Sequence, residues 1–205
     1  MLRDASGVRE GVDTYTMKLV AIGLVLGIAV GYLHGGRLLQ LSELKPRYAP
    51  LALAGLLLQL VNPPGSWPLV LLILSFVLLT AFTLANIRIV GFAAILVGVV
   101  LNFTVIAING GMPVAREAII ASGQEGTLAP LLEQHGVKHH LAGSEDRMLF
   151  LGDVIAVPAP VSQVISVGDL FTYGGMAVVI AGSMRRRSSS SLLPTLAEAP
   201  RVKVS

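Results

Sequence analysis

Long runs without a charged residue constrain this chain more than any other feature. Residues 67–87 and 89–115 contain no Lys, Arg, Asp or Glu, and the 205-residue chain is 54% hydrophobic and only 13% charged. A soluble domain has about a quarter of its residues charged, whereas a membrane-spanning helix needs about 20 mostly apolar residues. The sequence therefore predicts an all-α integral membrane protein, with room for one modest bundle rather than two domains.

We expect about five transmembrane helices joined by short connections and one long extracytoplasmic loop. The third and fourth are long, the first is short, and the second is marginal in length. An alternative is a re-entrant second segment, which leaves four crossings. The segment RMLFLGDVIAVPAP before the last helix is too short and too rich in proline to cross. The expected spans are residues 19–34, 48–61, 67–85, 87–108 and 165–184.

These spans divide the chain into three parts. They are a polar N-terminal extension (1–16), a membrane domain (17–184) whose outer loop covers 109–164, and a basic, serine-rich cytoplasmic tail (185–205). The tail has the composition of a disordered segment. Met17 and Lys18 directly precede the first span and offer a second start for the chain. The first span is alternatively a signal peptide, although HGGRLLQ is a poor neighbourhood for cleavage.

Orientation follows from Lys and Arg near the span ends, which concentrate on the cytoplasmic side. Five crossings place seven basic residues on one side of the membrane and six on the other. If the chain starts at Met17, the second side has four. We therefore expect the N-terminus outside and the C-terminus in the cytoplasm. The favoured cytoplasmic set is Arg37, Lys45, Arg47, Arg88, Arg185, Arg186 and Arg187.

Glycines at helical spacing predict where helices approach closely. Gly23, Gly27 and Gly31 lie on one face of the first span, and we call them the glycine ladder. Lipid provides no hydrophobic drive between helices, so association relies on small residues that let backbones meet. The ladder indicates packing within the chain or, alternatively, a homodimer contact. Gly91 and Gly98 form a second such face on the fourth span.

Polar residues on the same face of the fourth span predict an intramembrane polar site. Asn102 and Asn109 follow Gly98 at steps of four and seven, and Asp169 is the one acid inside any expected span. An unpaired amide or acid is costly in hydrocarbon, so we expect Asn102 to face Asp169, with Thr172 and Tyr173 nearby. The alternative role of Asp169 is a helix cap or a helix–helix hydrogen-bonding partner.

The outer loop offers few chemical groups. We expect a helix in MPVAREAIIASG, with Pro113 in its first turn, and another in TLAPLLEQHG. His135 and His139 are weak zinc candidates, because Gly136 interrupts a helix there and no third ligand has a diagnostic spacing. A solvated turn is the default for HGVKHH. The chain has no cysteine and no hydrolase, metalloprotease or nucleotide-binding motif, so we expect no catalytic residue and no cofactor.

The order of three motifs resembles the DUF5317 family of bacterial membrane proteins. NGGMPV follows a span, FLGDVIAVP follows a variable loop, and QVISVGD enters the last span. The resemblance covers most of 17–184 and implies a small multi-pass protein of the bacterial cell membrane with no assigned function. Its matching positions are Asn109, Gly110, Gly111, Met112, Pro113, Leu151, Gly152, Asp153, Ser166, Gly168 and Asp169.

Three classes of function remain open from the sequence. The first is a non-catalytic membrane component: an accessory subunit, scaffold or sensor that meets a protein partner. The second is a carrier or channel for a small or lipid-like solute, with Asn102 and Asp169 on its path. The third is a membrane enzyme using Asp153 or Asp169 with a loop histidine. The bilayer is the expected environment, and a net charge of +3 with basic residues beside apolar spans gives no indication of nucleic acid.

Overall fold

The computed structural model describes residues 23–61, 63, 66–128, 131 and 138–185. Three of its helices are long and apolar enough to cross a membrane: α3 (Trp67–Ala85), α4 (Phe92–Asn109) and α7 (Val167–Met184). Two shorter apolar helices are the first helix, Gly23–Leu33, and α2, Ala49–Leu60. The helical fold class expected from the sequence is confirmed.

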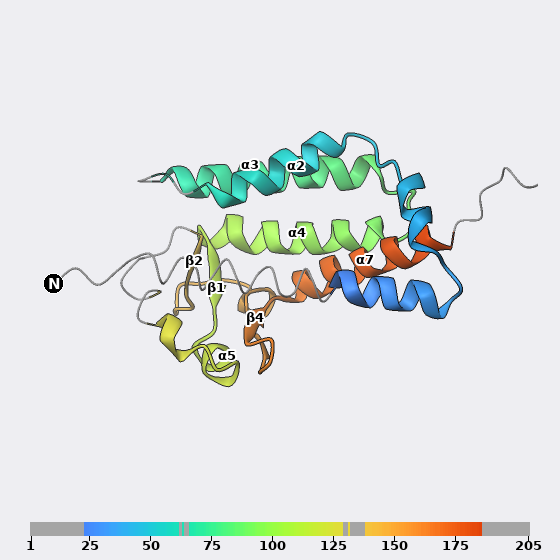
Figure 1. The fold of residues 1–205 in the computed structure, drawn as a ribbon. Coiled ribbons are helices and arrows are strands. Elements are labelled where there is room, and N and C mark those ends of the chain that lie inside the picture. The colour runs from blue at the N-terminus through green and yellow to red at the C-terminus, as the bar shows by residue number, and fades with distance from the viewer. Residues whose placement is uncertain (1–22, 62, 64–65, 129–130, 132–137, 186–205) are drawn as a thin grey trace, which may run out of the picture.

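The five helices alternate in direction along the chain, and the first helix lies beside α7 and runs parallel to it (Figure 1). The turn after the first helix meets the end of α7, where the Arg37 N–H donates to the Met184 carbonyl at 2.9 Å. The start of α2 meets the end of α3 through Arg47 and Asn86. This end of the bundle, which we call the basic end, carries five of the seven residues that sequence analysis grouped on one side: Arg37, Lys45, Arg47, Arg88 and Arg185.

The α2 helix runs alongside α3 towards the opposite end rather than turning back. The Gln59 amide donates to the Ser75 hydroxyl at 2.8 Å. At the last turn of α2, the Lys138 ammonium donates to the carbonyls of Gln59 and Val61. A cation there complements the partial negative charge of a helix C-terminus. The 12 residues of α2 rise only about 18 Å, less than the hydrocarbon thickness of a bilayer.

Several expected boundaries need correction. The third span matches α3, but α4 begins at Phe92 rather than residue 87, because Gly91 has a left-handed φ of +97° and serves as the N-cap. The last helix begins at Val167 rather than 165, since residues 163–165 form a strand. An apolar turn or strand beside a span cannot be distinguished from helix by hydropathy alone.

Close backbone approach on α7 organises the bundle. A Cβ on Gly27 would lie 2.9 Å from the Ala177 Cα, and one on Gly175 would lie 2.8 Å from the Gly91 carbonyl oxygen. A Cβ on Gly98 would collide with the Gly168 carbonyl. Both glycine faces therefore pack against α7 within the chain, as the first alternative for the ladder expected. Opposite α7, α4 meets α3 through an apolar core in which Phe76 stacks on Phe103 with centroids 6.0 Å apart.

The described part of the outer loop folds into a small cap over the other end of the helices (Figure 1). Strand β1 (Met112–Val114) pairs in parallel with β2 (His139–Leu141), and β3 (Ile155–Val157) pairs antiparallel with β4 (Gln163–Ile165). The expected helix around Pro113 is wrong at its start: α5 covers only Arg116–Ala121. The second expected helix lies mostly outside the described residues. Short 3₁₀ helices occupy Leu38–Glu43, Glu125–Thr127 and Leu149–Leu151.

Candidate functional site

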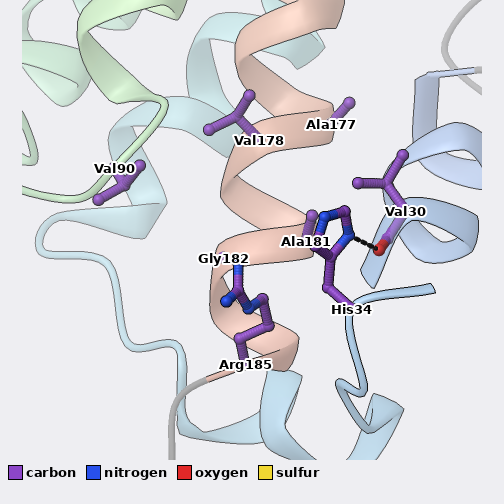
Figure 2. A pocket seen from close by; sticks show the side chains of 8 residues that line it. All are labelled: Val30, His34, Val90, Ala177, Val178, Ala181, Gly182 and Arg185. Carbon is purple, nitrogen blue, oxygen red and sulfur yellow. Dashed lines mark hydrogen bonds between the residues drawn. The ribbon is translucent and has the colours of Figure 1, made fainter. Parts of the chain in front are cut away.

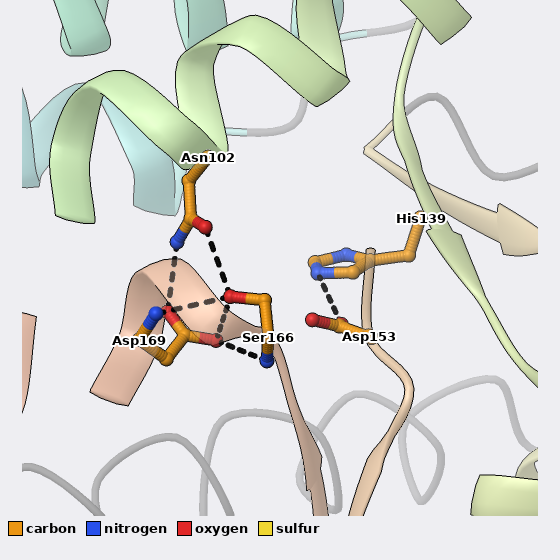
Figure 3. Close-up of polar contacts among 5 residues, drawn as sticks. All are labelled: Asn102, His139, Asp153, Ser166 and Asp169. Carbon is orange, nitrogen blue, oxygen red and sulfur yellow. Dashed lines mark hydrogen bonds and ion pairs between the residues drawn. The ribbon is translucent and has the colours of Figure 1, made fainter. Parts of the chain in front are cut away.

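A polar cluster of the buried residues Asn102 and Ser166 and the partly buried Asp169 joins α4 to the start of α7 (Figure 3). The Asn102 amide nitrogen donates to Asp169 Oδ1 at 2.8 Å, which confirms the contact expected from the sequence. Ser166 Oγ lies 2.9 Å from Asn102 Oδ1 and 2.8 Å from Asp169 Oδ2, and its single proton is shared between them. Asn102, Ser166 and Asp169 form what we call the polar joint.

Asp169 also caps its own helix. Ser166 is the N-cap of α7, and its hydroxyl accepts from the Asp169 N–H at 3.0 Å while the Asp169 carboxylate accepts from the Ser166 N–H at 3.0 Å. A reciprocal pair of this kind satisfies two backbone donors that the first helical turn leaves free, and the acid complements the helix dipole. Asp169 is therefore both a helix cap and an interhelical partner: its Oδ2 accepts from the Ser166 N–H, and its Oδ1 accepts from the Asn102 amide.

The depth of the joint follows from α4. Asn102 lies seven residues before the C-terminal residue Asn109, hence about 10 Å inside the end of the helix. Its side chain is 8% exposed, and the Ser166 side chain is fully buried. A glycine at position 168 is required for this contact, since a Cβ there would collide with the Asn102 amide. The joint is therefore a close-packed contact between two helices.

The two loop motifs, NGGMPV and FLGDVIAVP, lie against each other above the joint. The Asp153 N–H donates to the Pro113 carbonyl at 3.0 Å, and the Ala115 N–H donates to the Asp153 carbonyl at 2.9 Å. A Cβ on Gly152 would lie 2.7 Å from the Pro113 carbonyl oxygen, so only glycine lets the segments approach this closely. Backbone hydrogen bonds and a close glycine contact therefore hold the two motifs together.

Asp153 is a buried acid beside the joint. Its side chain lies in the cap, and burial, followed by repulsion from Asp169, raises its pKa well above the usual 3.8. His139 on β2 lies 3.9 Å from the Asp153 carboxylate (Figure 3). That separation is too long for a hydrogen bond, and the His139 side chain is half exposed. The Asp153 carboxyl is therefore harder to ionise than a carboxyl in water, and the two groups make a weak contact.

The other expected polar residues serve the fold at separate places. Asn109 ends α4, where its amide donates to the Arg147 carbonyl at 2.9 Å and accepts from the Arg147 N–H at 2.8 Å. Thr172 donates to the Gly168 carbonyl within α7, and Tyr173 lies beside Gly23 of the first helix. Asn102 and Asp169 are thus the two members of the expected five-residue site that meet.

Asn86 at the basic end repeats the contact that Asn109 makes at the cap end. Its amide donates to the Arg47 carbonyl at 2.8 Å, and its oxygen accepts from the Arg47 N–H at 2.7 Å. In each case an asparagine beside the C-terminus of a long helix binds both backbone groups of a residue remote in the chain.

The turn formed by Gly110 and Gly111 ends α4 after Asn109. Gly110 has a left-handed φ of +69°, a conformation that favours glycine at the end of a helix.

The histidine turn is corrected by the structure. Residues 139–141 form β2, and His140 lies 2.8 Å from the Asp146 carboxylate. Burial opposes ionisation of Asp146, but hydrogen bonds from the Gly143 N–H and His140 outweigh it and lower the pKa. His135 lies outside the described residues. Within the described part of the chain, no three His, Asp or Glu side chains are grouped as metal ligands.

Ser166 is the member of the joint that sequence analysis did not select as a site residue. A signal was present, because Ser-x-x-Asp directly before an apolar run is a capping-box pattern. Hydropathy placed the helix start at 165, which obscured the cap. Recognising the pattern would have fixed both the start of α7 and the direction of the Asp169 side chain.

Residues 39–181 match the model of a family described as a family of unknown function, DUF5317. A protein of Thermotoga maritima, described as uncharacterized, is 33% identical over 131 residues, which cover 62% of this chain and 73% of that protein. No solved structure gives a significant match.

Proposed function

The chain belongs to the DUF5317 family, whose function is unknown, and on that premise we propose that it is a non-catalytic membrane component. In this proposal the helices anchor the chain in the membrane, and the cap is presented outside it as the surface of an accessory subunit, scaffold or sensor. The observation that carries the proposal is the internal pairing of the polar joint, whose side chains bind one another between α4 and α7.

The hydrogen bonds of the joint favour a structural role over a solute path. Both Asp169 oxygens already accept hydrogen bonds, and the Asn102 amide contributes one donor and one acceptor to its neighbours. A solute bound here would have to replace these bonds, at a cost of about 1–3 kcal/mol for each buried group left unpaired. The joint therefore resembles a fastening between α4 and α7 more than a binding site.

The same burial argues against chemistry at Ser166. A serine nucleophile needs an accessible hydroxyl with a neighbouring base and room for a substrate. The Ser166 side chain is fully buried, and its hydroxyl accepts from the Asp169 N–H as well as donating. These contacts assign the hydroxyl to the helix cap.

Orientation completes the proposal. We place the basic end in the cytoplasm of a bacterial cell, because Lys and Arg beside spans concentrate there. Arg37, Lys45, Arg47, Arg88 and Arg185 lie at that end, and Arg186 and Arg187 follow in the sequence. The cap, with Arg116, Lys138 and Arg147, is then outside.

Flux measurements separate this proposal from the carrier alternative. The full chain is reconstituted in liposomes that contain a pH-sensitive dye, and a membrane potential is imposed; swelling in small neutral solutes is followed in parallel. We expect no flux above that of protein-free vesicles. Asp146→Asn is the control, since Asp146 lies in the cap and pairs with His140. The proposal would be overturned in favour of a carrier if the protein gave a flux that is lost in Asp169→Asn and kept in Asp146→Asn.

A further inference from the structure

A pocket opens at the basic end, far along α7 from the polar joint (Figure 2). It lies between the first helix, the residue before Gly91 at the start of α4, and the last two turns of α7. Its volume is about 370 Å³. The lining residues are Val30, His34, Val90, Ala177, Val178, Ala181, Gly182 and Arg185.

The walls of this pocket are apolar and uncovered. Val30 is 42% exposed, Val90 69% and Val178 46%. Gly182 forms part of the wall, and a Cβ built on it would have no atom within 4 Å. The pocket is therefore an open groove with space directly above Gly182, suited to a flexible hydrocarbon chain.

The polar groups of the groove lie at one end. Figure 2 shows the Arg185 and His34 side chains on the side away from Val178 and Ala177. His34 Nδ1 lies 2.9 Å from the Val30 carbonyl, which fixes Nδ1 as the donor and leaves Nε2 for another partner. Arg185 is exposed and follows the last residue of α7. The groove thus has a cationic mouth and an apolar body.

We propose that this groove binds an anionic phospholipid, with the phosphate at Arg185 and His34 and an acyl chain against Val178 and Gly182. The guanidinium matches a phosphate in charge and in fork geometry. From Arg185 to Val178 the helix rises about 10 Å, roughly two thirds of the hydrocarbon depth of one leaflet.

The proposal goes beyond the function proposed above. It requires the helices to lie in a bilayer, but neither the orientation of the chain nor the role of the cap. Failure of the flux test would leave it standing, and failure of the lipid test would leave the polar joint as described.

Lipid retention on the purified full chain tests the groove. The protein in detergent is titrated with phosphatidylglycerol or phosphatidylcholine, and bound lipid is counted by native mass spectrometry. We expect phosphatidylglycerol to bind more tightly than phosphatidylcholine. Gly182→Leu fills the groove and should weaken phosphatidylglycerol binding by at least about tenfold, whereas Arg185→Gln should weaken it by about fivefold.

Two control variants separate the groove from general effects. Gly174→Leu adds the same side chain to the same helix, again where nothing lies within 4 Å of a Cβ, but outside the groove. Arg88→Gln removes an exposed cation at the basic end that does not line the groove. Both should bind phosphatidylglycerol like the unmodified chain. Equal binding of the two lipids, or equal loss in Gly174→Leu and Gly182→Leu, would overturn the proposal.

Discussion

The direct hydrogen bond between Asn102 and Asp169 should give a measurable coupling energy. The perturbations are Asn102→Ala, Asp169→Ala and the double variant, which together form a double-mutant cycle. Hydrogen bonds between membrane helices average about 0.6 kcal/mol and reach about 1.7. In this 2.8 Å bond the Asp169 carboxylate accepts from the Asn102 amide at a partly buried position, and hydrogen bonds to charged groups are the stronger ones. We therefore expect a coupling of about 1–1.5 kcal/mol.

The two single variants should lose different amounts of stability, because each removes different hydrogen bonds of the polar joint. Asn102→Ala removes two hydrogen bonds and leaves Asp169 Oδ1 without its donor, a loss of about 2–3 kcal/mol. Asp169→Ala also removes the carboxylate that accepts from the Ser166 N–H, which is one half of the capping box, at a further cost of about 1 kcal/mol. This half of the box is lost equally with and without Asn102, so its contribution cancels in the cycle.

Reversible unfolding in mixed detergent micelles supplies the free energies, provided that each variant unfolds in one cooperative transition. A second cycle that pairs Asn109→Ala with Asp169→Ala is the control, because the Asn109 amide binds the Arg147 backbone instead. Its coupling should lie near zero. A coupling for Asn102 and Asp169 within about 0.3 kcal/mol of zero would refute the joint as an energetic link between α4 and α7.

Two further predictions concern the ladder and the cap. Gly27→Leu should lower thermal stability by about 1–3 kcal/mol, because its Cβ would meet the Ala177 backbone, whereas Gly174→Leu should leave melting nearly unchanged. Asp153 has a raised pKa when folded, so the folded state binds more protons and stability falls as pH rises from about 4 towards that raised value. Asp153→Asn should therefore gain stability relative to the unmodified chain as the pH rises above about 4. A difference in melting temperature that does not change with pH would contradict the burial argument.

The long apolar helices were the most predictable part of the chain, for a physical reason. A helix in lipid must satisfy its own backbone and present apolar side chains for about 20 residues, so α3 was delimited by hydropathy alone. The pairing of Asn102 with Asp169 followed from the same constraint. Two polar side chains at similar depth in hydrocarbon can satisfy each other's hydrogen bonds. The spacing of the glycines indicated which face of the helix carries them.

The cap was less predictable because its strands are short and non-local. Strand β1 has three residues and pairs with β2 about 27 positions later, so no local periodicity reports it. Pro113 favoured a helix start by its usual preference, but the Met112 N–H instead donates to the Lys138 carbonyl at 2.7 Å. Tertiary pairing decided that segment, and a single sequence does not contain the partner's register.

Cysteine labelling in intact cells tests most directly the central claim that a membrane-embedded bundle presents the cap outside. The chain has no cysteine of its own, so each variant carries one reactive thiol. Ser144 is exposed in the cap and Ser42 is exposed at the basic end; Ser189 lies in the C-terminal tail. We predict that an impermeant thiol reagent labels Ser144→Cys in intact cells, and labels Ser42→Cys and Ser189→Cys only after the membrane is opened. Labelling of Ser42→Cys and Ser189→Cys in intact cells, with Ser144→Cys protected, would contradict the account.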